Sequence, residues 1–234
     1  MTNRFERVAT YAVLVWFSFV AIYPVLTIVL LAFHKKSDLV TGFAWPTTFR
    51  LDTFTSAWHL GNFGPGMRNS LIVAVVVTAV SALFSLLTGY AFGTMRFRGE
   101  RPIFALVILG LIFPYEATVI PLYYDFQQLH LTNTLWALIL PQIGQSVSFG
   151  TFWMRAFFRS TPRSLVEAAR IDGAGSFTVL WRVLTPQAKP ALLTLSALVF
   201  MYTWNEFLLA LVMIQDQDLQ TAPLGLSFFA TATR

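Results

Sequence analysis

The chain has 234 residues, of which 56% are hydrophobic and only 12% are charged. Because a soluble domain carries about 25% charged residues, this composition is that of an integral membrane protein. The lack of cysteine excludes disulfides and thiolate metal sites, and the three histidines lie far apart without ligand spacing, so no metal site is expected. The net charge of +5 lies mostly in the loops, so it indicates membrane topology rather than nucleic-acid binding.

Five apolar segments predict membrane-spanning helices, since lipid obliges the backbone polar groups to bond within each segment. The predicted spans are residues 8–33, 69–95, 102–124, 135–158 and 191–214. The first is longer than the apolar core of a signal peptide, so we expect an uncleaved span with a kink at Pro24. The predicted fold is therefore all-α and polytopic, a single transmembrane domain over residues 1–234.

The segment 34–68, between the first two spans, combines glycines and prolines with interleaved tryptophans and phenylalanines. Aromatic rings of this kind suit a membrane interface, where an apolar ring has one wet edge. A poorly ordered loop is the alternative, and the residues alone leave it open.

Polar residues inside the later spans indicate a path or a packing contact. Glu116 lies in the third span after Pro114, and Glu206 lies in the fifth after Trp204 and Asn205. An ionisable residue in a membrane is costly and is a functional candidate by default, so these four positions, Glu116, Trp204, Asn205 and Glu206, are candidates for a substrate path. Interhelical hydrogen bonds that only stabilise the bundle are the alternative.

Residues 163–190, RSLVEAARIDGAGSFTVLWRVLTPQAKP, form a polar and basic segment between two spans. Thr161 and Pro162 predict a helix start with a hydroxyl cap, and Gly173 predicts its end near Asp172. A second short helix is expected to run from Ser176 to about Leu184. The final feature is a pair of prolines at 186 and 190, which should close the segment. We therefore predict a helix-turn-helix in water, in a loop over residues 159–190.

The distribution of Lys and Arg predicts the orientation of the chain. Two lie in the N-terminus, three in 95–101 and six in 155–190, against four in 34–68 and one at the C-terminus. With five spans, the first three segments share one side of the membrane. The positive-inside rule then places the N-terminus and the loop 159–190 in the cytoplasm of a multi-pass cell-membrane protein.

The segment EAARIDGA at 167–174, with WRVLTP at 181–186 and a further proline at 190, resembles the EAA loop of ABC-importer membrane subunits. WNEFLLAL, from Trp204, resembles a segment of sugar-importer permeases. The likeness covers roughly residues 5–230 and is greatest to the second permease of the carbohydrate, maltose-transporter class. Thr185 departs from it, since the family usually has leucine there. The family also usually has six spans, so we expect that the chain is truncated or that the last span was lost.

The resemblance implies a type I ABC-importer permease fold and a permease that moves a sugar or similar solute. It also implies that the EAA loop docks on a separate ATPase subunit, through Glu167, Ala168, Ala169, Asp172, Gly173 and Ala174. Glu167 would meet a basic residue of the ATPase, the alternative being an ion pair with Arg163 or Arg170 on its own helix. The implied partners are a second permease in a heterodimer, two ATPase subunits, an extracytoplasmic solute-binding protein and membrane lipid, but not nucleic acid.

The chain lacks both nucleotide-binding patterns, GxxxxGK[ST] and GxGxxG, and any Ser-His-Asp arrangement. We therefore expect no catalytic residue and no cofactor bound by this chain, with ATP and Mg on the partner ATPase subunits. The alternatives are a truncated or degenerate permease, and a non-transporting membrane assembly or regulatory protein. A secondary transporter working alone would need inverted repeats, and none is visible.

Overall fold

The computed structural model describes residues 4–34, 45 and 51–232. The chain divides into two units, Met1–Leu60 and Gly61–Arg234. The first unit contains α1 (Arg4–Leu31) and α2 (Asp52–Leu60). Proline at position 24 lies inside α1, and the apolar part of this helix, Glu6–Leu31, is not buried by the rest of the described chain. Residues 35–44 and 46–50 of the predicted interfacial loop lie outside the described residues, and its later part forms α2 and the start of α3.

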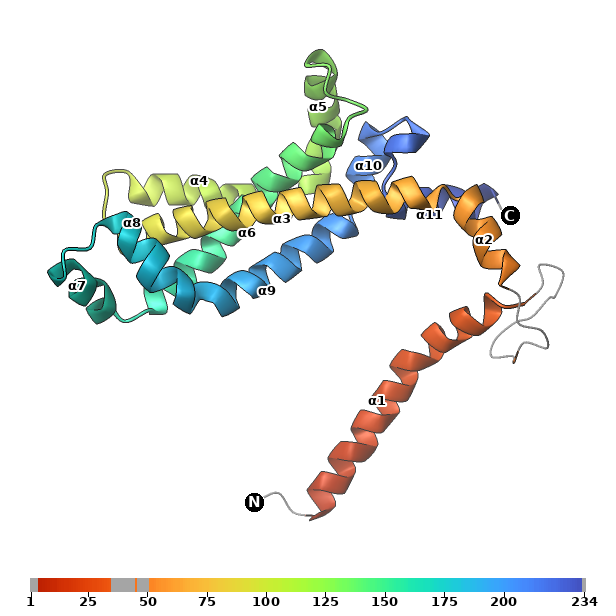
Figure 1. Ribbon diagram of the computed structural model, residues 1–234, viewed down its shortest axis with the longest axis horizontal. Helices are drawn as coiled ribbons and strands as arrows, with labels where there is room; N and C mark the ends of the chain where they lie inside the picture. The colour runs from red at the N-terminus through yellow and green to blue at the C-terminus, as the bar shows by residue number, and fades with distance from the viewer. Residues whose placement is uncertain (1–3, 35–44, 46–50, 233–234) are drawn as a thin grey trace. The chain divides into compact units, whose positions relative to one another are not determined.

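The second unit is a helical bundle (Figure 1). Its elements, in chain order, are α3 (Phe63–Thr94), α4 (Glu100–Ile112), α5 (Tyr115–Gln128), α6 (Leu135–Ser160), α7 (Arg163–Ile171), α8 (Ser176–Thr178), the π-helical η1 (Val179–Leu184), α9 (Thr185–Trp204), α10 (Leu208–Met213), the short 3₁₀ turn η2 (Gln217–Leu219) and α11 (Ala222–Ala232). Helices α3, α6 and α9 pack together as its centre. The elements α7 and α8 lie at one end of these three helices, and α10 and α11 lie at the other.

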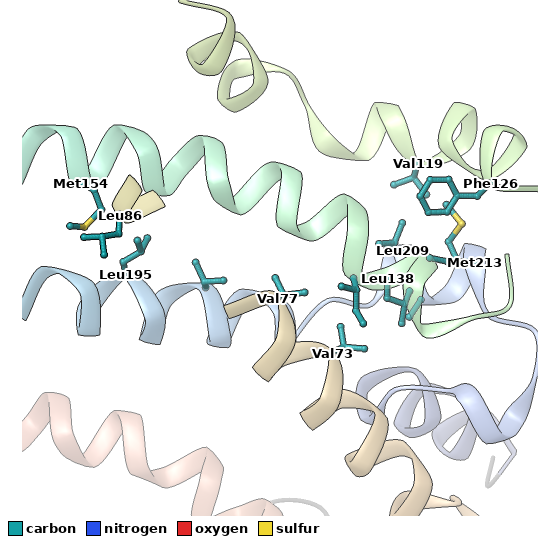
Figure 2. Packing of buried hydrophobic residues seen from close by; sticks show 14 of the residues in the cluster. Val73, Val77, Leu86, Val119, Phe126, Leu138, Met154, Leu195, Leu209 and Met213 are labelled. Carbon is teal, nitrogen blue, oxygen red and sulfur yellow. The ribbon is translucent and has the colours of Figure 1, made fainter. Parts of the chain in front are cut away.

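The core of the bundle depends on close contact between α3 and α6. An added Cβ on Gly89 would meet Met154, and one on Gly93 would lie 2.7 Å from the Cβ of Phe158. Small residues at these positions therefore allow the two helix backbones to approach closely. Figure 2 shows side chains from all three central helices, Leu86, Met154 and Leu195, meeting in this core.

The third predicted span is not one straight helix. Helix α4 ends at Ile112 and α5 begins at Tyr115, and the two are bent by 96° at this break. Pro114 lacks an N–H and cannot continue the backbone bonding of α4, so the helix stops there. The sequence indicated an interruption within 102–124, and the structure shows that it is a sharp bend.

The fifth predicted span also differs from the observed helix. The prediction that Pro186 and Pro190 close the preceding segment is wrong, because α9 begins at Thr185 and continues through both prolines. Pro186 lies just after the π-helical turn η1, so the change in backbone hydrogen bonding and the missing N–H fall at the same point of the helix. The helix instead ends at Trp204, ten residues before the predicted end of the span, and α10 follows.

Three of the described helices are long and apolar enough to cross a membrane, namely Glu6–Leu31, Phe63–Thr94 and Ser176–Trp204. The bent pair α4 and α5 makes a fourth if it is counted as one span. Helix α6 is of comparable length, with 26 residues, but it contains two glutamines and several serines among its apolar residues. The prediction of five spans stays a prediction.

Candidate functional site: the loop of α7 and a cavity beside α5

Helix α7 is a strongly amphipathic helix of nine residues, and its start differs in detail from the prediction. Thr161 does not cap it, because its hydroxyl donates back to the carbonyl of Phe157 at 3.2 Å. Pro162 occupies the N-cap position and Arg163 is the first helical residue. The helix therefore starts within two residues of the predicted point, and the proline marks the start.

The end of α7 is a glycine turn, as the sequence predicted. Gly173 has φ of +81°, a conformation that side-chain-bearing residues rarely adopt. The N–H of Gly173 donates to the carbonyl of Arg170 at 3.0 Å, and the N–H of Ala174 donates to that of Ala169 at 2.9 Å. This pair of bonds is the Schellman arrangement that terminates helices. It turns the chain into α8 within four residues.

The residues predicted to dock an ATPase divide into two groups. Glu167, Ala168, Asp172 and Gly173 are exposed, whereas Ala169 and Ala174 are half-buried and pack against the core. Within the described chain, Glu167 forms no ion pair with Arg163 or Arg170. Four of the six residues are thus exposed on the surface of the described chain, and the Glu167 carboxylate forms no ion pair there.

Two apolar residues of this loop were missed by the sequence reasoning. The Ile171 side chain is 86% exposed and the Phe177 side chain is 73% exposed, on either side of the Gly173 turn. Phe177 contacts Trp181 with a ring-centroid distance of 5.9 Å. Large apolar side chains in a polar loop are a signal that can be read from the sequence, because their exposure to water is unfavourable and marks an interaction surface.

The loop is tied to the bundle by buried contacts. The hydroxyl of Tyr90, at the end of α3, donates to the carbonyl of Ser176 at 3.1 Å. In η1, Val179, Leu180 and Leu184 are buried. Thr185 gives both its backbone N–H and its hydroxyl, at 2.8 Å, to the carbonyl of Leu180, five residues earlier. The residue that departs from the family pattern therefore closes the π-helical turn.

The four residues predicted to line a substrate path lie in two parts of the chain, Glu116 in α5 and the other three at the end of α9, and both glutamates lie close enough to Tyr115 to interact with it electrostatically. Glu116 is exposed in the first turn of α5. Trp204 stacks on Phe200 with a centroid distance of 5.8 Å. Asn205 donates to the Met201 carbonyl at 2.7 Å, and the Glu206 carboxylate accepts from the Leu209 N–H at 2.8 Å. Asn205 and Glu206 therefore bond to the helix ends on either side of the break after α9.

A cavity of about 390 Å³ lies where the α4–α5 bend faces α6. Its lining combines aromatic rings, small residues and polar groups: Gly110, Phe113, Tyr115, Thr118, Leu122, Pro141, Gly144, Gln145 and Ser148. The Tyr115 hydroxyl is buried without a hydrogen-bond partner in the described chain, and the Gln145 amide forms none there either. Free polar groups beside apolar walls are what a polar organic solute needs for binding. The described residues contain no group of three acidic or histidine side chains that could hold a metal.

The sequence and the fold of this chain are similar to those of known transport proteins. The family model described as "Binding-protein-dependent transport system inner membrane component" matches residues 85–231. The probable ABC transporter permease protein YurM of Bacillus subtilis is 35% identical over 212 residues, covering 90% of this chain and 70% of the relative. The diacetylchitobiose uptake system permease NgcG of Streptomyces coelicolor is 30% identical, covering 98% of this chain and 76% of the relative.

A solved structure supports the fold independently. A bacterial ABC transporter involved in import of the acidic polysaccharide alginate has a chain that superposes with a TM-score of 0.80, at 24% identity. The match covers 99% of this chain and 82% of that chain. The chain therefore belongs to the family of binding-protein-dependent transport system inner membrane components, the membrane-embedded permease subunits of ABC importers.

Proposed function

We propose that this permease carries a sugar across the membrane and that ATP hydrolysis on a separate subunit drives it through α7. The observation that carries the proposal is the exposed α7–Gly173–α8 turn, which is anchored to α3 through Tyr90 and continues into α9. A displaced turn would therefore move two central helices of the bundle. The names of relatives support the solute class, since one is a diacetylchitobiose permease and another, AraQ of Halalkalibacterium halodurans, an arabinooligosaccharide permease at 32% identity.

The proposal includes partners. Since the sequence has no nucleotide-binding pattern, ATP and Mg would bind to ATPase subunits docked at Glu167, Ala168, Asp172 and Gly173. A second permease subunit would complete the passage, and an extracytoplasmic binding protein would deliver the solute. In this arrangement, α7 and the N-terminus face the cytoplasm, as the positive-inside rule predicts.

The cavity beside α5 is the proposed point of sugar contact. Sugars bind through hydrogen bonds to amides and hydroxyls and through apolar contact with aromatic rings. Tyr115 and Gln145 supply the first, because their polar groups have no hydrogen-bond partner within the described chain, and Phe113 supplies the second. The hydroxyls of Thr118 and Ser148 already donate to carbonyls of their own helices. We propose this cavity, rather than Trp204, Asn205 and Glu206, as the place where the sugar binds, because the side chains of Asn205 and Glu206 already form local hydrogen bonds.

Substitution of Gly173 tests the docking. Gly173→Val forces a β-branched side chain to φ of +81°, so the turn should change shape and the ATPase subunit should no longer co-purify. Gly175→Ala is the control, because its φ is −69° and a Cβ there meets nothing within 4 Å. Co-purification and substrate-stimulated ATP hydrolysis are the measurements. If the Gly173 variant retains both at the level of the control, the loop is not the docking site.

A further inference from the structure

A second and larger cavity, of about 970 Å³, lies beside the segment formed by α7, the Gly173 turn and α8, which we call the docking loop. It is enclosed by the C-terminal ends of α3 and α6, the start of α4 and one face of α7. Positions 163, 166, 167 and 170 of α7 line it, which is one helical stripe, whereas Ala168 and Ile171 do not. The cavity therefore adjoins the exposed surface proposed to meet the ATPase and shares only Glu167 with it, since Ala168, Asp172 and Gly173 do not line the cavity.

Its ionisable lining has an excess of positive charge. The six ionisable residues are Arg96, Glu100, Arg159, Arg163, Glu167 and Arg170. Glu100 is already engaged, since its carboxylate lies 3.4 Å from Arg159 and 4.0 Å from Arg155. Three guanidinium groups, those of Arg96, Arg163 and Arg170, have no ion pair or hydrogen bond within the described chain. The C-terminal ends of α3 and α6 each contribute only about half an elementary negative charge, which together do not offset this excess.

Unpaired arginines around one cavity repel each other, and an anion between them would relieve that repulsion. Guanidinium groups bind phosphate through two parallel hydrogen bonds, which makes phosphate the anion that this set of donors fits best. The cavity also lies where α3 and α6 end, and its Glu100 begins α4, on which Ile103 and Leu106 are 46% and 66% exposed. A phosphate on a lipid headgroup could therefore keep its acyl chains along apolar surface.

We propose that the cavity formed by α3, α6 and α7 binds a phosphate-bearing anion through Arg96, Arg163 and Arg170. The anion is the headgroup of an acidic phospholipid or a free phosphate compound, which present the same chemistry. Bound there, it would join α7 to the ends of two central helices by charge-assisted bonds. The binding does not depend on which solute the permease carries.

The test compares two triple variants with the same change in charge. Arg96→Gln, Arg163→Gln and Arg170→Gln remove the cavity donors together. Arg98→Gln, Arg101→Gln and Arg182→Gln remove three exposed arginines that do not line the cavity. The full chain, with its partner subunits, is placed in nanodiscs of phosphatidylcholine with phosphatidylglycerol, and the retained phosphatidylglycerol is counted by native mass spectrometry. In a second arm, inorganic phosphate is titrated calorimetrically into nanodiscs of phosphatidylcholine alone.

The cavity variant should bind about 100-fold more weakly, because each basic residue near an anionic group contributes about fivefold to affinity. The control variant should bind as the unsubstituted chain does. Loss confined to phosphatidylglycerol identifies a lipid, and loss confined to inorganic phosphate identifies a soluble ligand. Should the triple variant fail to fold, Arg170→Gln alone should weaken binding about fivefold.

Three results would overturn the proposal. The first is that neither anion binds the unsubstituted chain, and the second is that both triple variants lose binding equally, which indicates surface charge alone. The third is that the cavity variant binds both anions normally but loses the ATPase subunit. In that case the arginines belong to the protein interface.

Discussion

At the scale of single residues, the polar groups of the α5 cavity differ from those at the end of α9. The Glu206 carboxylate and the Asn205 amide already have backbone partners, so substituting them would disturb the helix ends. Gln145 and the Tyr115 hydroxyl have none within the described chain. A group without a partner in the free protein is available to a solute, and its loss changes binding rather than folding.

Replacement of Gln145 should weaken transport without harming the fold. Gln145→Leu removes one hydrogen bond worth about 0.5–1.5 kcal/mol, so we expect KM for uptake to rise about two- to tenfold. Uptake is measured with labelled sugar in vesicles containing the assembled transporter, after a screen of oligosaccharides against its binding protein. Gln127→Leu, on the exposed end of α5 outside the cavity, is the matched control. Equal KM values for the two variants would remove the cavity from the path.

At the scale of elements, α6 lies close to α3 and α9 at a position where α6 has a glycine, Gly150. An added Cβ on Gly150 would meet the hydroxyl of Ser85 and would lie 3.2 Å from Leu195. Gly144, on the same helix, has nothing within 4 Å of that position. One helix thus contains one glycine that packing requires and another that it does not.

The two glycines predict opposite outcomes for the same substitution. Gly150→Val should destabilise the bundle by about 1–3 kcal/mol, because the backbones of α3 and α6 must separate. Gly144→Val should change stability far less, since it points into open space. The measurement is loss of helical ellipticity during titration of the detergent-solubilised protein with dodecyl sulfate. Equal midpoints for the two variants would contradict the observed packing.

The docking loop gives a further prediction at this scale. Ile171→Ala and Phe177→Ala should each weaken association with the ATPase subunit by more than about 1 kcal/mol, or roughly fivefold, because buried apolar anchors dominate interfaces. Ser164→Ala is the control, as an exposed residue of α7 without a hydrogen bond in the described chain. Affinity is measured by titrating the ATPase subunit against permease in nanodiscs. Unchanged affinity for both loop variants would show that the interface lies elsewhere.

At the scale of the whole molecule, the orientation of the chain can be tested because it has no cysteine. Ser164→Cys on α7 should react with a membrane-impermeant maleimide only from the cytoplasmic side. Gln128→Cys, at the end of α5, should react only from the opposite side, as the positive-inside rule requires. Labelling of right-side-out and inside-out vesicles distinguishes the two. If Ser164→Cys is labelled from outside, the proposed topology is inverted.

The sequence predicted the membrane class, the helices and the docking loop because each rests on a local signal. The long apolar segments of the sequence predicted α3 and α6, and Gly173 predicted the end of α7. The 96° bend at Pro114 was not predictable, because a missing N–H shows where a helix stops but not the direction of the next one. The cavities were not predictable either, since Tyr115 and Gln145, or Arg96 and Arg170, meet only through tertiary packing.

The helix that begins in the docking loop has a mechanical consequence. From Ser176 to Trp204 the chain is helical over 29 residues, including η1 and both prolines. At about 1.5 Å per residue, this length is roughly 43 Å, the thickness of a bilayer with its headgroups. One end lies beside Gly173 and the other at Asn205, so one continuous stretch of helical backbone links the docking loop to the break after α9. A displacement of the docking loop would therefore act on the break at Asn205 through the backbone of a single helical segment.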